Sequence, residues 1–348
     1  MSIHKSIIIN AILGSCLWMG CQKDSPTPSG ITSVSVNSNG SVYVTNEGNF
    51  GAGNAMVSYF NPSTGASSED LYKPANGYAL GDVCQSMYVV NEKAYLVVNN
   101  SGKVVVVNPL TFQLKGTIGG LNSPRYFLPI TNSKAYVSDL YANGISVVDL
   151  NANSKIGFIA CPGWTEQMIY LFGKVFVTNE THNQLYVVDP MLDKVTDSIA
   201  VGYGANSIKQ DKNGKIWVLC GGNANLQQPG GIFRINPSNN QLEASITCGN
   251  LSDSPWRLAL NPTNDTLYYL NGGVYRMSIN DISFPGSAFL PKLSHNYYGL
   301  GINPADGSIY ISDAIDYVQR GMVYRISPMG KTLNQFLAGI IPGDFYFN

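Results

Sequence analysis

The stretch Lys174-Val-Phe-Val-Thr-Asn179 decides the fold, because close variants of it return along the chain. The other copies are Ser41-Val-Tyr-Val-Thr-Asn46, Lys93-Ala-Tyr-Leu-Val-Val98, Lys134-Ala-Tyr-Val-Ser-Asp139, Lys215-Ile-Trp-Val-Leu-Cys220, Thr266-Leu-Tyr-Tyr-Leu-Asn271 and Ser308-Ile-Tyr-Ile-Ser-Asp313. Successive aromatic residues of these seven copies are 52, 41, 40, 41, 51 and 42 positions apart. The chain is therefore an array of units with a period of about forty residues.

Each copy has the features of a short β-strand that leaves a tight turn. Its residues are mostly β-branched or aromatic, and a turn such as Asp211-Lys-Asn-Gly214 stands before it. A second strand follows, as in Leu185-Tyr-Val-Val-Asp189, and a proline comes next. Helical repeats of similar length need apolar residues at helical spacing, whereas the period here is two. Seven units of four short strands predict an all-β fold, a seven-bladed β-propeller.

Ring closure is predicted from the innermost strands. In six units a further strand precedes the repeated phrase, over segments 82–90, 124–130, 166–171, 206–210, 255–261 and 298–303. The first unit lacks such a segment, and Gly343-Asp-Phe-Tyr-Phe347 is the unassigned strand that can supply it. We therefore predict that residues 31–348 form one ring, in which the C-terminal strand pairs into the first blade and removes the open edge.

Composition bears on the class of partner. Only 12% of the 348 residues are charged, against about 25% in an ordinary soluble domain. Lys and Arg number 21 against 22 Asp and Glu, so there is no basic excess to neutralise phosphates, and we expect no nucleic-acid partner. No internal apolar run is long enough for a membrane helix.

The N-terminus has the layout of a bacterial lipoprotein signal. His4 and Lys5 precede an apolar run, and Gly20 stands directly before Cys21. We expect residues 1–20 to be a cleaved signal peptide, Cys21 to be lipidated and residues 21–30 to be an extended tether. The Gln-Lys-Asp run after Cys21 resembles the surface-export signal of Bacteroidetes lipoproteins. We therefore expect a lipid-anchored protein on the outside of the outer membrane, with a plain signal peptide as the alternative.

Amides and aromatic residues gather in the loops that enter the innermost strands and in those that join the second and third strands. In a propeller these loops form one rim and line the central pore. Such a lining suits a large, mostly neutral ligand with flat faces. The residues that we predict to bind it are Arg125, Tyr126, Trp164, Gln167, Tyr203, Trp256, Arg257, Tyr297, Tyr298 and Tyr317. The alternative for each of them is a role in capping strands or packing blades.

Catalytic patterns are weak. Two histidines, His182 and His295, follow the signal segment, and neither stands beside a recognisable nucleophile. A lactonase-like propeller would gather carboxylates around a metal in the pore. The candidates for that are Glu47, Asp82, Asp139, Glu166, Asp313 and Asp344, whose spacing is not that of metal ligands. We predict a binding protein without enzymatic activity, cofactor or metal, and keep a metal-dependent hydrolase as the alternative.

Four cysteines follow Cys21, namely Cys84, Cys161, Cys220 and Cys248. The last two end strands of the same predicted blade, with a third strand between them. That arrangement separates them by about 9 to 10 Å, which is too far for a regular disulfide. We therefore predict free, buried thiols.

Several runs together resemble one known family. They are Asn46-Glu-Gly-Asn-Phe50, Gly81-Asp-Val-Cys-Gln-Ser-Met87, Val97-Val-Asn-Asn-Ser101, Ser123-Pro-Arg-Tyr126, Thr165-Glu-Gln-Met168, Asp265-Thr-Leu-Tyr268, Tyr297-Tyr-Gly-Leu300, Asp313-Ala-Ile-Asp-Tyr317 and Gly339-Ile-Ile-Pro-Gly343. The family is that of the YncE-like, seven-bladed surface lipoproteins of Bacteroidetes, which includes the BtuG-type cobalamin-capture proteins. The resemblance implies capture of cobalamin or a related corrinoid and its delivery to a TonB-dependent outer-membrane transporter. A surface-layer or adhesive propeller that binds another large neutral ligand is a further alternative.

Overall fold

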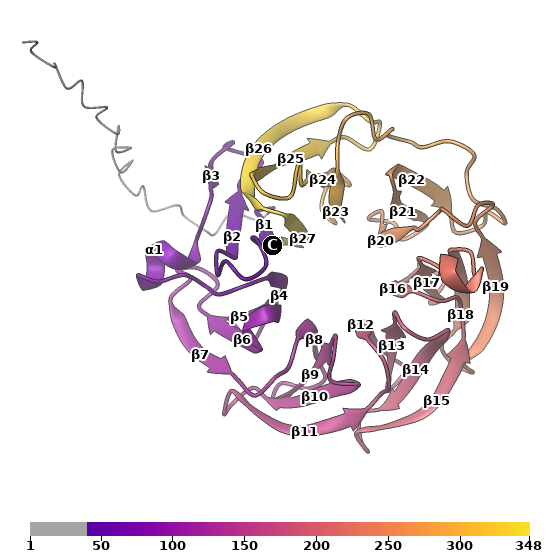
Figure 1. Cartoon of the computed structure of the whole chain (residues 1–348), viewed down its shortest axis with the longest axis horizontal. Helices are drawn as coiled ribbons and strands as arrows, with labels where there is room; N and C mark the ends of the chain where they lie inside the picture. Colours follow the sequence, from indigo (N-terminus) through magenta and orange to yellow (C-terminus); the bar gives the residue numbers. More distant parts are fainter. Residues whose placement is uncertain (1–39) are drawn as a thin grey trace, which may run out of the picture. The chain divides into compact units, whose positions relative to one another are not determined.

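The computed structural model describes residues 40–348, whose strands form seven sheets around a central axis (Figure 1). Each sheet is one blade, and the prediction of a seven-bladed, all-β propeller is confirmed. The predictions for the signal peptide, Cys21 and the tether concern residues outside the described part of the chain.

The blades are numbered here from the N-terminus, and each is given from its innermost strand outward. Blade 1 contains β27 (Pro342–Phe347), β1 (Val42–Asn46), β2 (Met56–Phe60) and β3 (Ser67–Ser68). Blade 2 contains β4 (Cys84–Val90), β5 (Lys93–Val98), β6 (Lys103–Val107) and β7 (Leu114–Ile118). Blade 3 contains β8 (Pro124–Pro129), β9 (Lys134–Asp139), β10 (Gly144–Asp149) and β11 (Ser154–Ala160).

The remaining blades continue the same order around the ring. Blade 4 contains β12 (Thr165–Leu171), β13 (Lys174–Asn179), β14 (Gln184–Asp189) and β15 (Lys194–Ala200). Blade 5 contains β16 (Ala205–Gln210), β17 (Ile216–Cys220), β18 (Gly231–Asn236) and β19 (Gln241–Thr247). Blade 6 contains β20 (Trp256–Leu260), β21 (Thr266–Asn271) and β22 (Gly273–Ser278). Blade 7 contains β23 (Tyr297–Ile302), β24 (Ile309–Asp313), β25 (Arg320–Ile326) and β26 (Thr332–Ile340).

The C-terminal strand closes the ring as predicted. Strand β27 pairs antiparallel with β1, with Phe347 opposite Val42 and Phe345 opposite Val44. In Figure 1 the chain end therefore lies beside the start of the described chain, at the inner edge of blade 1. Because the innermost strand of blade 1 comes from the other end of the sequence, the seven blades have no free inner edge there.

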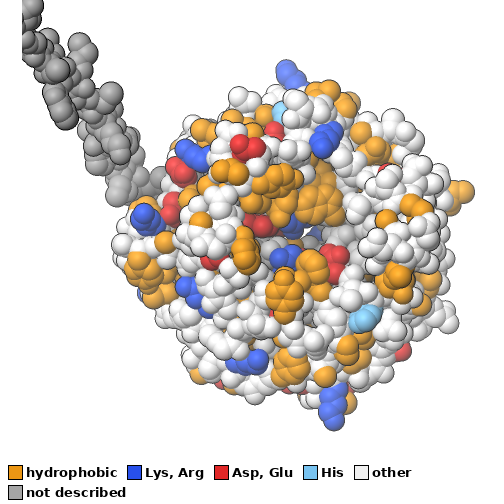
Figure 2. Space-filling view, in the orientation of Figure 1, with side chains coloured by type: hydrophobic (Ala, Val, Ile, Leu, Met, Phe, Trp, Pro, Cys, Tyr) orange, Lys and Arg blue, Asp and Glu red, His pale blue; other side chains and the backbone are white. Residues whose placement is uncertain are grey.

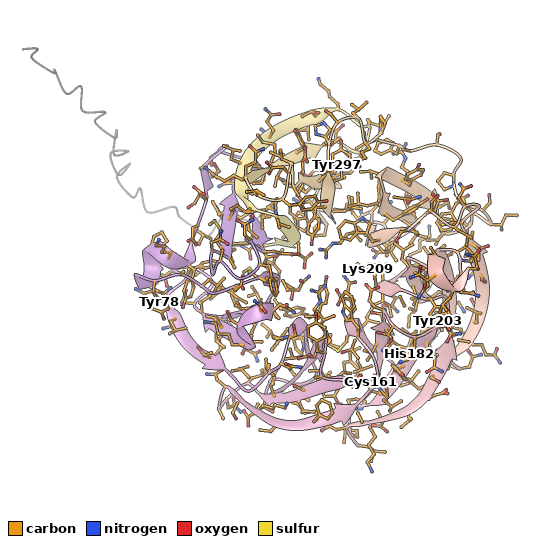
Figure 3. The ribbon with its side chains drawn as sticks, in the orientation of Figure 1. Tyr78, Cys161, His182, Tyr203, Lys209 and Tyr297 are labelled. Carbon is orange, nitrogen blue, oxygen red and sulfur yellow. The ribbon has the colours of Figure 1, made fainter. Side chains whose placement is uncertain are left out.

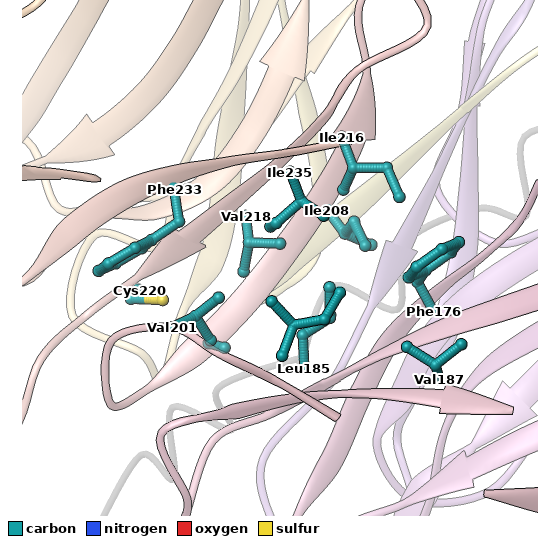
Figure 4. Packing of buried hydrophobic residues seen from close by; sticks show 12 residues of the cluster. Phe176, Leu185, Val187, Val201, Ile208, Ile216, Val218, Cys220, Phe233 and Ile235 are labelled. Carbon is teal, nitrogen blue, oxygen red and sulfur yellow. The ribbon is translucent and has the colours of Figure 1, made fainter. Parts of the chain in front are cut away.

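The core lies between neighbouring blades, which explains why the repeated strands are apolar on both faces. In β13, Val175 and Val177 pack toward blade 3, whereas Phe176 packs toward blade 5. Figure 4 shows the second of these interfaces, where Leu185 and Val218 meet. Alternate side chains of a strand point to opposite faces, so a strand that is covered on both sides is apolar along its length.

Blade 6 departs from the four-strand expectation. The chain after β22 makes a single antiparallel bridge, between Val274 and Leu290, where an outer strand was predicted. Pro285, Gly286 and Pro291 lie in this stretch, and prolines cannot donate to a strand ladder. The two prolines of this segment therefore explain why blade 6 has no fourth, outer strand.

Helices are few and short. They are α1 (Tyr72–Asn76) and the 3₁₀ turns η1 (Asn99–Ser101) and η2 (Ala224–Leu226). In residues 40–348, no helix has the length and apolar character that crossing a membrane requires.

The described cysteines are all free, as predicted. Cys84, Cys161 and Cys220 are buried, whereas Cys248 is half-buried, so the prediction of burial is wrong for that residue. Strand β18 separates the two cysteines of blade 5, as the spacing argument required.

Candidate functional site

A β-bulge near the start of an innermost strand is the local feature that builds the candidate site. In β8, Pro124 pairs with Asp139 and Phe127 pairs with Val137, so two residues of β8 face one residue of β9. The strands β4, β12, β16, β20 and β23 have a similar register shift at the same level. The residues skipped by the pairing are Gln85, Arg125, Tyr126, Glu166, Gln167, Asn206, Arg257, Leu258, Tyr298 and Gly299. A bulge re-aims side chains, and most of these residues line the axial cavities.

Hydroxyl groups of the repeated phrase hold three of these bulges. The backbone N–H of Tyr126 donates to Ser138 Oγ at 3.0 Å, and that of Gly299 donates to Ser312 Oγ at 2.6 Å. In blade 4 the Thr178 hydroxyl donates to the carbonyl of Gln167 at 3.0 Å. Each hydroxyl belongs to the Ser or Thr that precedes the last residue of the phrase. In these three blades the repeated phrase therefore supports the bulge as well as the strand.

The upper end of the central channel is a cavity of about 190 Å³, called the mouth below. Its walls come from the starts of the innermost strands of blades 3 to 7 and from the adjoining loops. The lining residues are Arg125, Tyr126, Trp164, Glu166, Glu180, Asn206, Ser207, Trp256, Arg257 and Tyr298. Figure 2 shows a central hollow with hydrophobic side chains and both signs of charge around it.

An ion pair organises one side of the mouth. The Arg125 guanidinium donates to both oxygens of Glu166, at 2.7 and 2.8 Å, and to Gln85 Oε1 at 2.5 Å. The Trp164 indole N–H also donates to Glu166, at 2.6 Å, and the guanidinium lies 5.2 Å from the centre of the indole ring. A bidentate pair is geometrically specific, so Arg125, Glu166 and Trp164 hold one another in place.

A second arginine crosses the channel. Arg257 on β20 of blade 6 donates to the Tyr126 hydroxyl on β8 of blade 3, at 2.9 Å. We call this hydrogen bond the crossbar, because it joins opposite sides of the ring and separates the mouth from the channel beneath. The guanidinium also lies 5.1 Å from the Trp256 ring and 5.8 Å from the Tyr298 ring. Arg257 has a φ of +61°, a strained conformation of the kind that is found at functional sites.

Of two further carboxyl groups, Glu180 lines the mouth and Glu47 bonds its lining residue Tyr298. The Tyr298 hydroxyl donates to Glu47 at 2.9 Å, and burial raises the pKa of Glu47. Burial, together with the nearby Glu166 carboxylate, raises the pKa of Glu180 to about 8. This shift reduces the negative charge of Glu180 near neutral pH. The positive charges of Arg125 and Arg257 therefore face less negative charge than Glu47, Glu166 and Glu180 would carry if all three were ionised.

The closing strand also contributes to the mouth. A Cβ atom at Gly343 would lie 3.1 Å from Glu47 Oε1 and 3.6 Å from an Arg257 nitrogen. The absence of a side chain at this position keeps the backbone of β27 close to both charged groups. Closure of the ring and assembly of the mouth therefore depend on the same strand.

The structure brings together six of the ten residues predicted to bind a ligand. They are Arg125, Tyr126, Trp164, Trp256, Arg257 and Tyr298. Gln167 lies lower in the channel, and Tyr317 contacts the Tyr298 ring edge-on at 5.9 Å without lining the cavity.

The other two predicted residues lie away from the mouth. Tyr297 stacks on His295, with ring centres 5.2 Å apart, and packs between blades because its neighbour Tyr298 takes the bulged position. Tyr203 lies in the loop before β16, where its carbonyl accepts the Gly222 N–H, and Figure 3 places it away from the central opening. Sequence spacing alone does not distinguish these orientations.

Several other candidates have structural roles. The side chains of Asp139 and Asp313 accept backbone N–H groups of the adjoining loops, and Asp313 also bonds His295 Nδ1 at 2.7 Å. Asp82 accepts from the Gly51 N–H and from Asn100. His182 lies on the rim, away from the central opening in Figure 3. Within residues 40–348, no three His, Cys, Asp or Glu side chains are placed to hold a metal ion.

Sequence reasoning missed two residues that line the channel. Glu180 directly follows the repeated phrase of blade 4 and lines the mouth. Lys209 lies in the middle of β16 and faces the channel below the crossbar. A lysine within an otherwise uncharged innermost strand is the sequence feature that could have identified Lys209.

Fold and cavity together define the class: a seven-bladed β-propeller with a polar and aromatic axial mouth. The chain belongs to the family described as "Domain of unknown function (DUF5074)", whose model matches residues 40–326. No curated protein matches the sequence.

Solved structures share the fold at low sequence identity. A quinonprotein alcohol dehydrogenase-like protein of Bacteroides thetaiotaomicron superposes with a TM-score of 0.69 at 16% identity, over 89% of this chain and 78% of that one. A candidate 6-phosphogluconolactonase of Bacteroides fragilis gives 0.65 at 12% identity, over 90% and 99% of the two chains. Another from Bacteroides uniformis gives 0.64 at 14%, over 90% and 100%. Identities this low establish the fold alone.

Proposed function

We propose that this chain is a binding protein that captures a large ligand with flat faces at the mouth, and that the ligand is cobalamin or a related corrinoid. The observation that carries the proposal is the pair of arginine–tryptophan stacks, Arg125 on Trp164 and Arg257 on Trp256. Each indole is held in place by its arginine and remains partly exposed. Rigid, partly exposed aromatic rings give contact area at a low entropic cost.

The size of the mouth limits how such a ligand binds. A cavity of about 190 Å³ is smaller than the usual range of about 300 to 1,000 Å³ for ligand pockets. A corrin disc would therefore lie across the rim, against Trp164, Trp256 and Tyr298, and only one of its substituents would enter the mouth. Its amide fringe would find a hydrogen-bonding partner in the carboxyl group of Glu180, which lines the mouth.

Calorimetric titration with cyanocobalamin and with cobinamide tests this proposal. We expect heat of binding and a shift in the corrinoid absorption spectrum for the native chain. Trp164→Ala and Trp256→Ala should each raise Kd about thirtyfold, which corresponds to about 2 kcal/mol. Phe172→Ala is the matched control, because Phe172 is 65% exposed in the turn at the opposite end of β12. No heat and no spectral change with either corrinoid would end the corrinoid proposal.

We further propose that the protein acts on the outer face of the outer membrane, anchored by a lipid on Cys21, and hands its ligand to a TonB-dependent transporter. The support is the Gly20-Cys21 signal and the resemblance described above. Cys21→Ser should move the protein from the membrane fraction to the soluble fraction. Protease added to intact cells should digest the native protein. Retention of the serine variant would contradict the anchor, and full protection from protease would contradict outward exposure.

A hydrolase remains the second candidate function. What favours it is the Glu180 carboxyl group, whose pKa burial raises and which lines the same cavity as an arginine–carboxylate pair, since perturbed carboxyl groups cluster at catalytic sites. The two candidates differ in turnover. Lactone hydrolysis that a chelator abolishes would establish the metal-dependent hydrolase, whereas stoichiometric binding without turnover would favour capture.

A further inference from the structure

Beneath the crossbar the channel continues as two adjoining cavities of about 360 and 450 Å³, called the lower channel below. Five residues line both cavities, namely Gln167, Ile169, Lys209, Asp344 and Phe345. They come from β12, β16 and β27, which are innermost strands of three different blades. Figure 3 places Lys209 beside the central opening. This space is distinct from the mouth and takes no part in the function proposed above.

Three polar side chains of the lower channel, Lys209, Asp344 and Gln167, keep hydrogen-bonding capacity that no group in residues 40–348 uses. Within residues 40–348, the Lys209 ammonium forms no hydrogen bond or ion pair, although Asp344 lines the same two cavities. One oxygen of Asp344 accepts the N–H of Phe345 at 3.0 Å, and the other has no donor in the described chain. Gln167 uses its carbonyl oxygen to accept the Ile208 N–H at 3.2 Å, which leaves its amide NH₂ available.

Partial burial in the channel disfavours the charged forms of Lys209 and Asp344, whose side chains are half-buried. It lowers the pKa of the Lys209 ammonium and raises the pKa of the Asp344 carboxyl. A buried charge is normally paired or hydrogen-bonded, because its desolvation is otherwise uncompensated. A cation and an anion that share a cavity without pairing therefore present two complementary points of attachment to a ligand.

Apolar side chains form part of the walls around these groups. Leu128 and Met168 line the smaller cavity, and Leu260 and Ile302 line the larger one. Arg257, the cationic end of the crossbar, also lines the larger cavity. A simple anion would be attracted to Lys209 and Arg257 but repelled by Asp344, and a simple amine would be attracted to Asp344 but repelled by the two cations. A molecule that carries both charges on an apolar body complements all of these surfaces.

We propose that the lower channel is a second binding site, for a small zwitterion with an apolar side chain, of which an apolar α-amino acid is the simplest case. The ligand carboxylate pairs with Lys209 and accepts from the Gln167 amide, and the ligand ammonium pairs with Asp344. The apolar side chain fills the space between Ile169 and Phe345.

Titration of the full chain with L-phenylalanine and L-leucine tests this site by calorimetry. The half-ligands 3-phenylpropionate, which lacks the ammonium, and 2-phenylethylamine, which lacks the carboxylate, are the matched probes. We expect both amino acids to bind and each half-ligand to bind at least about tenfold more weakly than phenylalanine, because each loses one of two charge-assisted contacts. Absence of binding by both amino acids would overturn the proposal.

Three variants assign the contacts. Lys209→Met should raise the phenylalanine Kd at least about tenfold and remove the advantage of phenylalanine over 2-phenylethylamine, whereas Lys209→Arg should retain both. Asp344→Asn should remove the advantage over 3-phenylpropionate. Unchanged affinity in Lys209→Met would overturn the proposal. Trp164→Ala, which alters the mouth at a residue that lines neither lower cavity, should leave amino-acid binding intact, so this site and the corrinoid proposal can fail separately.

Discussion

The mouth and the lower channel are neighbouring parts of the central channel. They differ in whether their charged side chains form ion pairs with one another. Above the crossbar, Arg125 is bound on two sides, by Glu166 and by Gln85. Below it, Lys209 and Asp344 line the same cavities but form no ion pair in the described chain. Charged side chains that pair with one another are preorganised and form a fixed surface. Charged side chains that lack partners can instead form hydrogen bonds or ion pairs with a ligand. Arg125 and Glu166 therefore fix the shape of the mouth, whereas Lys209 and Asp344 are available to bind a ligand.

Removal of the closing strand should have the largest effect, because that strand serves both regions. Deletion of residues 343–348 takes away Gly343 next to Glu47, Asp344 in the lower channel, and the ladder to β1. It also exposes the edge of β1. We expect the melting temperature, measured by circular dichroism, to fall by more than about 10 °C. An unchanged melting temperature would contradict closure by β27.

Breaking the ion pair between Arg125 and Glu166 should have the next largest effect on stability. The side chains of Arg125 and Glu166 are only 15% and 5% exposed, so Glu166→Gln leaves a buried guanidinium without its main counter-charge. We expect a loss of about 3 kcal/mol in the free energy of unfolding, measured with urea. The control is Lys212→Ala, which breaks the exposed pair with Asp265 and should cost less than about 1 kcal/mol. Equal losses in the two variants would contradict the role assigned to the pair.

The raised pKa of the Glu180 carboxyl group should make stability depend on pH. The pKa of Glu180 is raised from 4.5 to about 8 in the folded chain, so the folded state holds a proton that the unfolded state has released between these values. Stability should therefore fall as pH rises from 4.5 to 8. Glu180→Gln should reduce this fall, as measured by urea midpoints across the range. Glu47 and Asp344 shift in the same direction and should leave a residual slope. An identical slope in the variant would contradict the assignment.

Removal of the unpaired ammonium should have the smallest effect on stability. Lys209→Met deletes a half-buried charge that has no ion-pair partner in residues 40–348 and replaces it with an apolar chain of similar length. We expect the free energy of unfolding to change by less than about 1 kcal/mol, because lost attraction to Asp344 is offset by lost desolvation cost. A loss as large as that of Glu166→Gln would show that Lys209 is paired, and the contrast between the two regions would fail.

The repeat made the blades predictable because each phrase encodes a strand buried on both faces. The inner strands were located to within one or two residues, and ring closure followed from a count of strands. The missing outer strand of blade 6 was not predicted, because the repeat was extended over a segment whose prolines prevent pairing.

The candidate site was less predictable because it depends on bulges. Strict alternation would assign Tyr297 and Tyr298 to opposite faces without saying which one faces the channel. The two-residue bulge at Tyr298 and Gly299 decides this. Lys209 was not predicted because the sequence-based site was built from loop residues and strand starts. The lower channel lies instead between the middles of the inner strands.

The central claim is that the mouth is the ligand-binding site, and a crystal structure of the chain with bound cyanocobalamin tests it most directly. We predict that the corrin disc lies across the rim, in contact with Trp164, Trp256 and Tyr298, with one substituent entering the mouth. A corrinoid bound at the opposite face or on the outer strands, with the three aromatic side chains free of contact, would contradict the account.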